Sequence, residues 1–176
     1  MSNQFTPKGN YAKFSDMPPN DFLSTLSSSH RAKVLQVTKQ LEDAAATAKL
    51  DLIWYLGSVN FIARNKLVPA LSVTIVFGGN GPRAGHIELE LYIYKEHQAD
   101  DDAMPPAAWR VEVEFGVSCE CTFDHGIHSV EQHEWEAYAP DTLAEALKPA
   151  VSTFVEIMNK VEPAHTYRER LGLPND

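Results

Sequence analysis

Carboxylates recur at every second residue in two segments from the middle of this chain. The segments read HIELELYIY at 86–94 and RVEVEF at 110–115. Strict alternation of polar and apolar residues is typical of a β-strand that buries one face and exposes the other. The acidic residues of both segments are therefore expected on the exposed face. That face would carry Glu88, Glu90, Glu112 and Glu114, with Tyr92 and Tyr94 among them.

Crowded carboxylates favour a cationic neighbour, because like charges opposite one another destabilise a sheet. A turn near His125 would bring Glu134 and Glu136 onto the same face, with Arg110 as a partial counter-charge. The pattern predicts a docking surface for a basic partner, with the tyrosines as aromatic anchors. The predicted partner-binding residues are Glu88, Glu90, Tyr92, Tyr94, Glu112, Glu114, Glu134 and Glu136. The alternative interpretation is a solvated sheet face that keeps the protein soluble.

Thiols and imidazoles are concentrated in the segment that follows, between residues 119 and 133. Side chains of these types can hold zinc, and a cysteine beside a histidine can act as a nucleophile. The spacing matches no standard zinc pattern, and no oxyanion donor is evident, so a metal- or thiol-dependent enzyme is the alternative hypothesis. Its residues would be Cys119, Cys121, His125, His128 and His133. The phase of both cysteines with the apolar row favours buried, inert thiols.

Composition limits the class of partner. The chain has 176 residues, of which 44% are hydrophobic, and this suits one compact domain. It contains 15 Lys and Arg against 24 Asp and Glu, a formal net charge of −9. Nucleic-acid backbones and anionic membranes should be repelled, and a basic protein is the favoured partner.

Location is predicted from the first residues, the apolar runs and the cysteines. The N-terminal residues lack the basic and apolar regions of a secretory signal. The densest apolar run, Leu50–Leu56, is too short to span a bilayer. Cys119 and Cys121 are too close along a strand for disulfide geometry, which indicates a reducing, cytoplasmic setting.

The elements that must position these residues follow from hydrophobic spacing. Apolar steps of three and four predict a long helix from Ser28 or Ser29 through Val59, closed by Asn65 and Pro69. A second such stripe predicts a helix from Asp141 or Thr142 to Pro163. Four strands are expected between them, at Leu71–Phe77, His86–Lys95, Trp109–Phe123 and Ile127–Tyr138.

This order predicts an α+β fold. Sequential strands joined by short loops favour an antiparallel meander, here of four strands. The apolar stripes of the N-terminal and C-terminal helices would pack on one sheet face, giving a two-layer sandwich. Residues 1–19 and 164–176 are expected to be tails, and residues 20–163 a single domain.

The sequence therefore predicts a non-catalytic acidic binding protein of the inhibitor, immunity or chaperone type. It would dock a basic protein through the carboxylate-rich sheet face and use no cofactor or metal. Nucleic acid and membranes are not expected partners. A homodimer formed through the second sheet face is a third alternative.

Overall fold

The chain forms a five-stranded sheet packed against helices in a computed structural model. The structure describes Phe14 and residues 27–61, 66–77, 86–95, 109–118, 127–137 and 142–174. Side chains are described in these ranges except at 55–61, 66–69 and 95. The elements are α2 (Ser28–Ala48), β1 (Ile53–Phe61), β2 (Lys66–Phe77), β3 (Ile87–Lys95), β4 (Trp109–Ser118), β5 (Ile127–Ala137), α3 (Leu143–Met158) and α4 (Ala164–Leu171).

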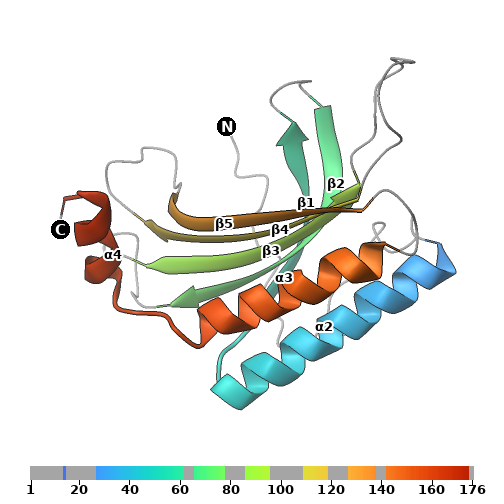
Figure 1. The fold of residues 1–176 in the computed structure, drawn as a ribbon, viewed down its shortest axis with the longest axis horizontal. Coiled ribbons are helices and arrows are strands. Elements are labelled where there is room, and N and C mark those ends of the chain that lie inside the picture. The colour runs from blue at the N-terminus through green and yellow to red at the C-terminus, as the bar shows by residue number, and fades with distance from the viewer. Residues whose placement is uncertain are drawn as a thin grey trace.

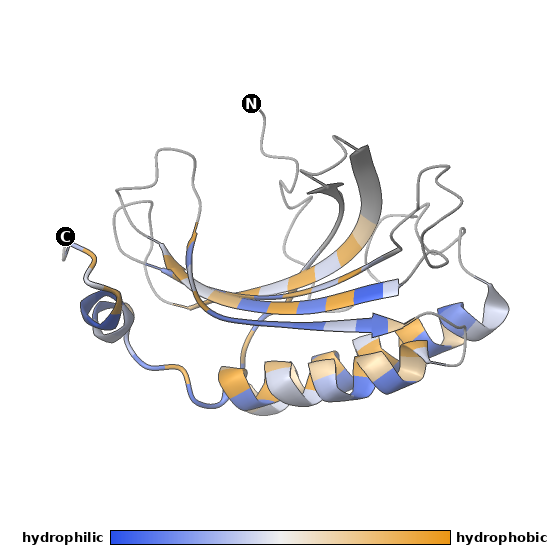
Figure 2. Cartoon of the chain, turned by 45° about the horizontal axis from the view of Figure 1, so that its top comes forward, coloured by the Kyte–Doolittle hydropathy of each residue, from blue (hydrophilic) through white to orange (hydrophobic). Residues whose placement is uncertain are grey.

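The sheet is an antiparallel meander in which every strand pairs with its neighbours in sequence. The spatial order is β1-β2-β3-β4-β5. One row across the sheet runs from Val73 to Leu91, Val113 and His133, and this register fixes which residues share a face. The first three of these side chains are fully buried or nearly so. Hydropathy accordingly alternates along the strands (Figure 2).

Helices α2 and α3 form the second layer. They lie side by side across one face of the sheet (Figure 1), with α3 packed on β3, β4 and β5. The buried stripe of α3 includes Leu147, Ala150 and Phe154, as its sequence spacing predicts. The two-layer α+β arrangement is thus confirmed. None of the described helices covers the other sheet face (Figure 1).

The N-terminal helix ends earlier than its apolar spacing predicts. Ser27 caps α2 by accepting a hydrogen bond from the His30 backbone N–H. Lys49 ends it in the left-handed conformation, with φ of 58°. The predicted continuation through Val59 is wrong, because residues 53–61 form β1 and pair with β2.

The prediction of four strands is therefore wrong by one, and the sheet has five. Strand β2 also begins before the predicted Leu71, and Pro69 lies inside it rather than after a helix. Pro69 pairs with Ser58 of β1, whereas the β3 pairing begins only at Ala70. Within the described ranges, β2 therefore has no strand partner at Pro69 on the side away from β1, and proline, which has no N–H, is tolerated at such an edge.

The C-terminal residues fold back onto the sheet, where the sequence suggested only a tail. Tyr167 of α4 is buried, and its ring meets Phe115 edge to face at 5.1 Å between centroids. Arg168 Nε donates a hydrogen bond to the Ser118 carbonyl at 3.1 Å. Among the described helices, none has both the length and the apolarity that crossing a membrane requires.

Candidate functional site

The sheet register gathers the predicted partner-binding residues on the face opposite the helices. Glu90 lies directly opposite Glu114, and Tyr92 lies opposite Glu112. Glu112 in turn lies opposite Glu134 of β5. We use the name carboxylate face for Glu88, Glu90, Tyr92, Tyr94, Glu112, Glu114, Glu134 and Glu136. All eight share one side because residues paired across strands point the same way.

The two halves of this face differ in burial. On the β2–β3 side Glu90 is only 7% exposed and Tyr94 only 2%. On the β4–β5 side the side chains of Glu134 and Glu136 are 42% and 32% exposed. Charge therefore extends from a buried part near β3 to an accessible part at β5, the edge strand.

Hydroxyl groups hold the more buried carboxylates. Thr74 Oγ1 donates a hydrogen bond to Glu90 Oε1 at 2.8 Å, and the Tyr92 hydroxyl donates to the other oxygen. The Tyr94 hydroxyl donates to Glu112 Oε1 at 2.6 Å. These donors are neutral, so they orient the carboxylates without cancelling their charge.

Arg110 supplies the cationic counterpart at the β5 edge. Its guanidinium forms ion pairs with both Glu134 and Glu136. Among the side chains that the structure describes, it is the only lysine or arginine on this face. Arg110 also acts electrostatically on Glu112, and on β3 the His86 Nε2 lies 2.6 Å from Glu88 Oε1.

Burial and mutual repulsion alter the acidity of the two β4 carboxylates. The pKa of Glu114 is raised by burial and by the charges of Glu90, Glu112 and Glu88. The pKa of Glu112 is raised by burial and by Glu134, against the lowering effect of the Tyr94 hydrogen bond and of Arg110. A nearby cation or a bound proton would therefore stabilise both carboxyl groups.

A β-bulge shifts the pairing of β4 with β5 by one residue between Phe115 and Gly116. Phe115 pairs with Glu131, whereas Gly116 pairs with Ser129, so one residue of β5 is extra. Glu131 consequently shares the helix-facing side with Phe115 and does not join the carboxylate face. A Cβ on Gly116 would lie 2.8 Å from the His128 carbonyl oxygen, so a side chain here requires movement.

The alternative cysteine and histidine site is only partly within the described residues. Cys119, Cys121 and His125 lie outside them. His133 lies opposite Val113 and His128 opposite Val117, five residues apart on β5. That separation is about 16 Å along a strand, too far for one metal ion. Within the described ranges, no three His, Cys, Asp or Glu side chains are placed to hold a metal.

His133 instead belongs to a cavity of about 450 Å³ between β5, α3 and α4. Its ring stacks on Trp135, and its Nε2 lies 2.5 Å from Glu131 Oε1. The lysine and arginine of this cavity are paired internally, Lys160 with Glu156 and Arg170 with Glu162. A second cavity of about 490 Å³ lies between α2 and α3.

Sequence reasoning missed two polar residues of the helix-free face. Ser72 lies opposite Tyr92, and Thr74 lies opposite Glu90. The alternation of Leu71, Val73 and Ile75 already implies that the residues between them face the other way. Comparisons of the chain with protein-family models, curated proteins and solved structures gave no match.

Proposed function

We propose that this protein is a non-catalytic binding protein that docks a basic protein partner through the carboxylate face. The observation that supports this most is the direct opposition of Glu90 and Glu114 at the centre of a face with one described arginine. Such opposition destabilises a sheet unless a cation relieves it. A partner bearing lysines or arginines supplies that relief.

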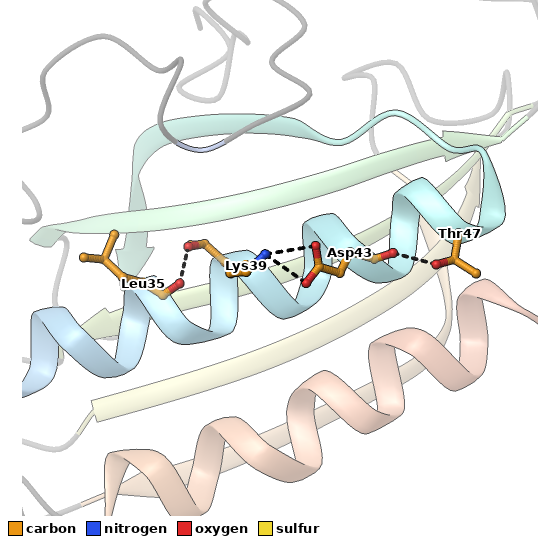
Figure 3. A network of polar contacts seen from close by, with 5 residues as sticks. Leu35, Lys39, Asp43 and Thr47 are labelled. Carbon is orange, nitrogen blue, oxygen red and sulfur yellow. Dashed lines mark hydrogen bonds and ion pairs between the residues drawn. The ribbon is translucent and has the colours of Figure 1, made fainter.

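Charged residues on the outer surface of α2 are arranged differently. Lys39 Nζ lies 3.1 Å from Asp43 Oδ2, one helical turn away (Figure 3). The Thr47 hydroxyl donates to the Asp43 carbonyl at 2.8 Å (Figure 3). Opposite charges placed this way are typical of a solvated helix surface. On the carboxylate face, the opposed Glu90 and Glu114 accept hydrogen bonds from neutral hydroxyls, Glu90 from Thr74 and Tyr92 and Glu114 from Ser129, which supports binding rather than mere solubility.

The two tyrosines take different roles in this proposal. Tyr92 is partly exposed and extends the partner-binding surface next to Glu90. Tyr94 is almost fully buried, so we assign it to holding the Glu112 carboxylate rather than to contacting the partner. Partner contacts are then expected to concentrate on the glutamates of β4 and β5 and on Tyr92.

The proposal is tested with octalysine as a probe, by fluorescence anisotropy at low and physiological ionic strength. We expect salt to weaken binding, and E112Q/E114Q to weaken it by at least about fivefold, since each exposed charge pair contributes roughly 0.5–1 kcal/mol. The matched control is E145Q/E169Q, which removes the same charge from exposed positions on α3 and α4. Equal losses in both variants would show only a response to net charge and contradict the proposal.

A further inference from the structure

The cavity between α2 and α3 is a groove that runs along both helices. On α2 its lining residues recur at intervals of three and four, at Lys33, Gln36, Val37 and Gln40. Residues with this spacing form one strip along a helix surface. Helix α3 contributes a second strip, which begins at Ala144. The groove of about 490 Å³ therefore follows α2 for two helical turns, which is roughly 11 Å.

The groove has an apolar floor and a polar rim. Val37 and Leu147 on the floor are only 6% and 1% exposed, and Val151 beside them is half-buried. Gln40 and Lys148 on the rim are exposed. A groove of this form is typical of sites that receive the apolar side of an amphipathic helix.

The charged side chains that line the groove are cationic. They are Lys33 and Lys148, and none of the described residues that line it carries a carboxylate. Asp43, further along α2, does not line the groove, and its carboxylate lies 3.1 Å from Lys39 Nζ. The chain as a whole has 24 Asp and Glu against 15 Lys and Arg. The groove is thus a positive region of an acidic protein, whereas the cavity beside α4 pairs its lysine and arginine with glutamates.

The first turn of α3 adds positive potential at one end of the groove. Ala144 of this turn lines the groove. The first N–H groups of a helix have no partner within the helix and carry partial positive charge. Thr142 at the N-cap makes no capping hydrogen bond with its side chain, and exposed Glu145 offsets only part of the potential. Lysines and helix terminus therefore both favour a negatively charged ligand.

We infer that this groove binds an acidic amphipathic helix of a partner protein. Its aliphatic side chains would contact Val37, Leu147 and Val151, and its glutamates or aspartates would lie beside Lys33 and Lys148. A helix suits the site because α2 and α3 lie side by side and begin at the same end of their layer (Figure 1), so a third helix can pack along both. The inference is independent of the proposed function, since it assigns a partner of opposite charge to the opposite side of the sheet.

Fluorescence anisotropy with a labelled peptide at low and physiological ionic strength tests the inference. The probe is an amphipathic peptide of leucine, alanine and glutamate, about 15 residues long so that it forms a helix in isolation. Its counterpart with glutamine in place of every glutamate is the control ligand. We expect the acidic peptide to bind more tightly than the neutral one despite the net charge of −9, and salt to weaken its binding.

Variants of the chain locate the binding. Lys33→Gln/Lys148→Gln should weaken acidic-peptide binding about threefold or more, since it removes two exposed ion pairs with the peptide. The matched control is Lys39→Gln/Lys160→Gln, which removes the same charge outside the groove and should retain most of the affinity. Ala144→Leu keeps both lysines but fills the groove, so it should weaken binding to a similar extent. Thermal unfolding checks that each variant is folded.

Several outcomes would overturn the inference. They are absence of acidic-peptide binding, equal binding of the neutral peptide, equal losses in the two double variants, and unchanged affinity in Ala144→Leu. A wild-type dimer in sedimentation that dissociates in Ala144→Leu would assign the groove to a second copy and overturn the assigned partner. None of these outcomes changes octalysine binding to the carboxylate face, so the proposed function is judged separately.

Discussion

The side chains on the two faces of the sheet are stabilised by different interactions. On the helix-covered face, residues such as Leu89 and Val113 are fully buried against the α2–α3 layer and the neighbouring strands. On the carboxylate face, Glu90 and Glu114 oppose one another between neutral hydroxyl donors. Both faces arise from the same alternation, so adjacent residues of one strand serve stability on one face and, in the function we propose, recognition on the other.

The largest effect on stability should come from truncating a large apolar side chain on the helix-covered face. Leu89→Ala is expected to lower the free energy of unfolding by about 3 kcal/mol, through lost burial and the cavity left behind. Glu88→Ala, one residue away on the other face, should change it by less than about 1 kcal/mol. Urea unfolding of both variants measures the difference. Comparable losses would contradict the division between the faces.

The next effect concerns the bulge that assigns β5 residues to their faces. Gly116→Ala places a Cβ 2.6 Å from Ile127 Cδ1 and 2.8 Å from the His128 carbonyl oxygen. We expect a loss of about 1–3 kcal/mol in unfolding free energy, as for other overpacked sites. Adding Ile127→Ala should recover only part of this, because the backbone contact remains. Full recovery in thermal unfolding would assign the whole effect to the side chain.

A smaller effect should distinguish two neighbours on β2. Thr74→Ala removes a donor from the buried Glu90 carboxylate and should cost about 1–2 kcal/mol. Ser72→Ala removes a buried hydroxyl that has no hydrogen-bond partner in the described part of the chain, so stability should stay equal or rise by up to about 1 kcal/mol. Chemical denaturation of the pair checks this. A clear loss in Ser72→Ala would show that its hydroxyl is already bonded in the unbound protein.

The smallest expected effect is a change in how steeply stability falls with rising pH. The folded-state pKa values of Glu112 and Glu114 are raised, mainly by burial. Their contribution to stability is therefore complete below the pKa of an unfolded glutamate and is lost as the pH rises through the raised values. E112Q/E114Q should flatten this fall in Tm, and E145Q/E169Q should retain it. Identical profiles of Tm against pH for the two double variants would contradict the raised pKa values of Glu112 and Glu114.

Period-two alternation predicted most of the strands and the membership of the carboxylate face, because the face of a strand residue depends only on its parity. The first strand could not be predicted this way. Leu52, Tyr55 and Val59 also fit helical steps of three and four, and pairing with β2 decides between the two patterns. The bulge at Phe115 and Gly116 likewise depends on the register of two strands rather than on either alone.

The sequence predicted which residues share the carboxylate face, but it could not predict how buried they are or which groups they contact. Alternation cannot show that Tyr94 is buried and bonded to Glu112, or that Arg110 is occupied by Glu134 and Glu136. These contacts depend on neighbours from three strands. The helical fold of residues 164–171 was missed because the segment is short and mostly polar, and tertiary contacts of Tyr167 and Arg168 stabilise it.

The most direct test of the central claim is to map where octalysine binds by ¹⁵N–¹H NMR titration of the full chain. If the carboxylate face is the recognition surface, the amide shifts should be largest in β3, β4 and the glutamate-bearing end of β5, and small in α2, α3 and α4. Shifts that are spread evenly over the acidic residues of the helices, or that are centred on α4, would contradict the account.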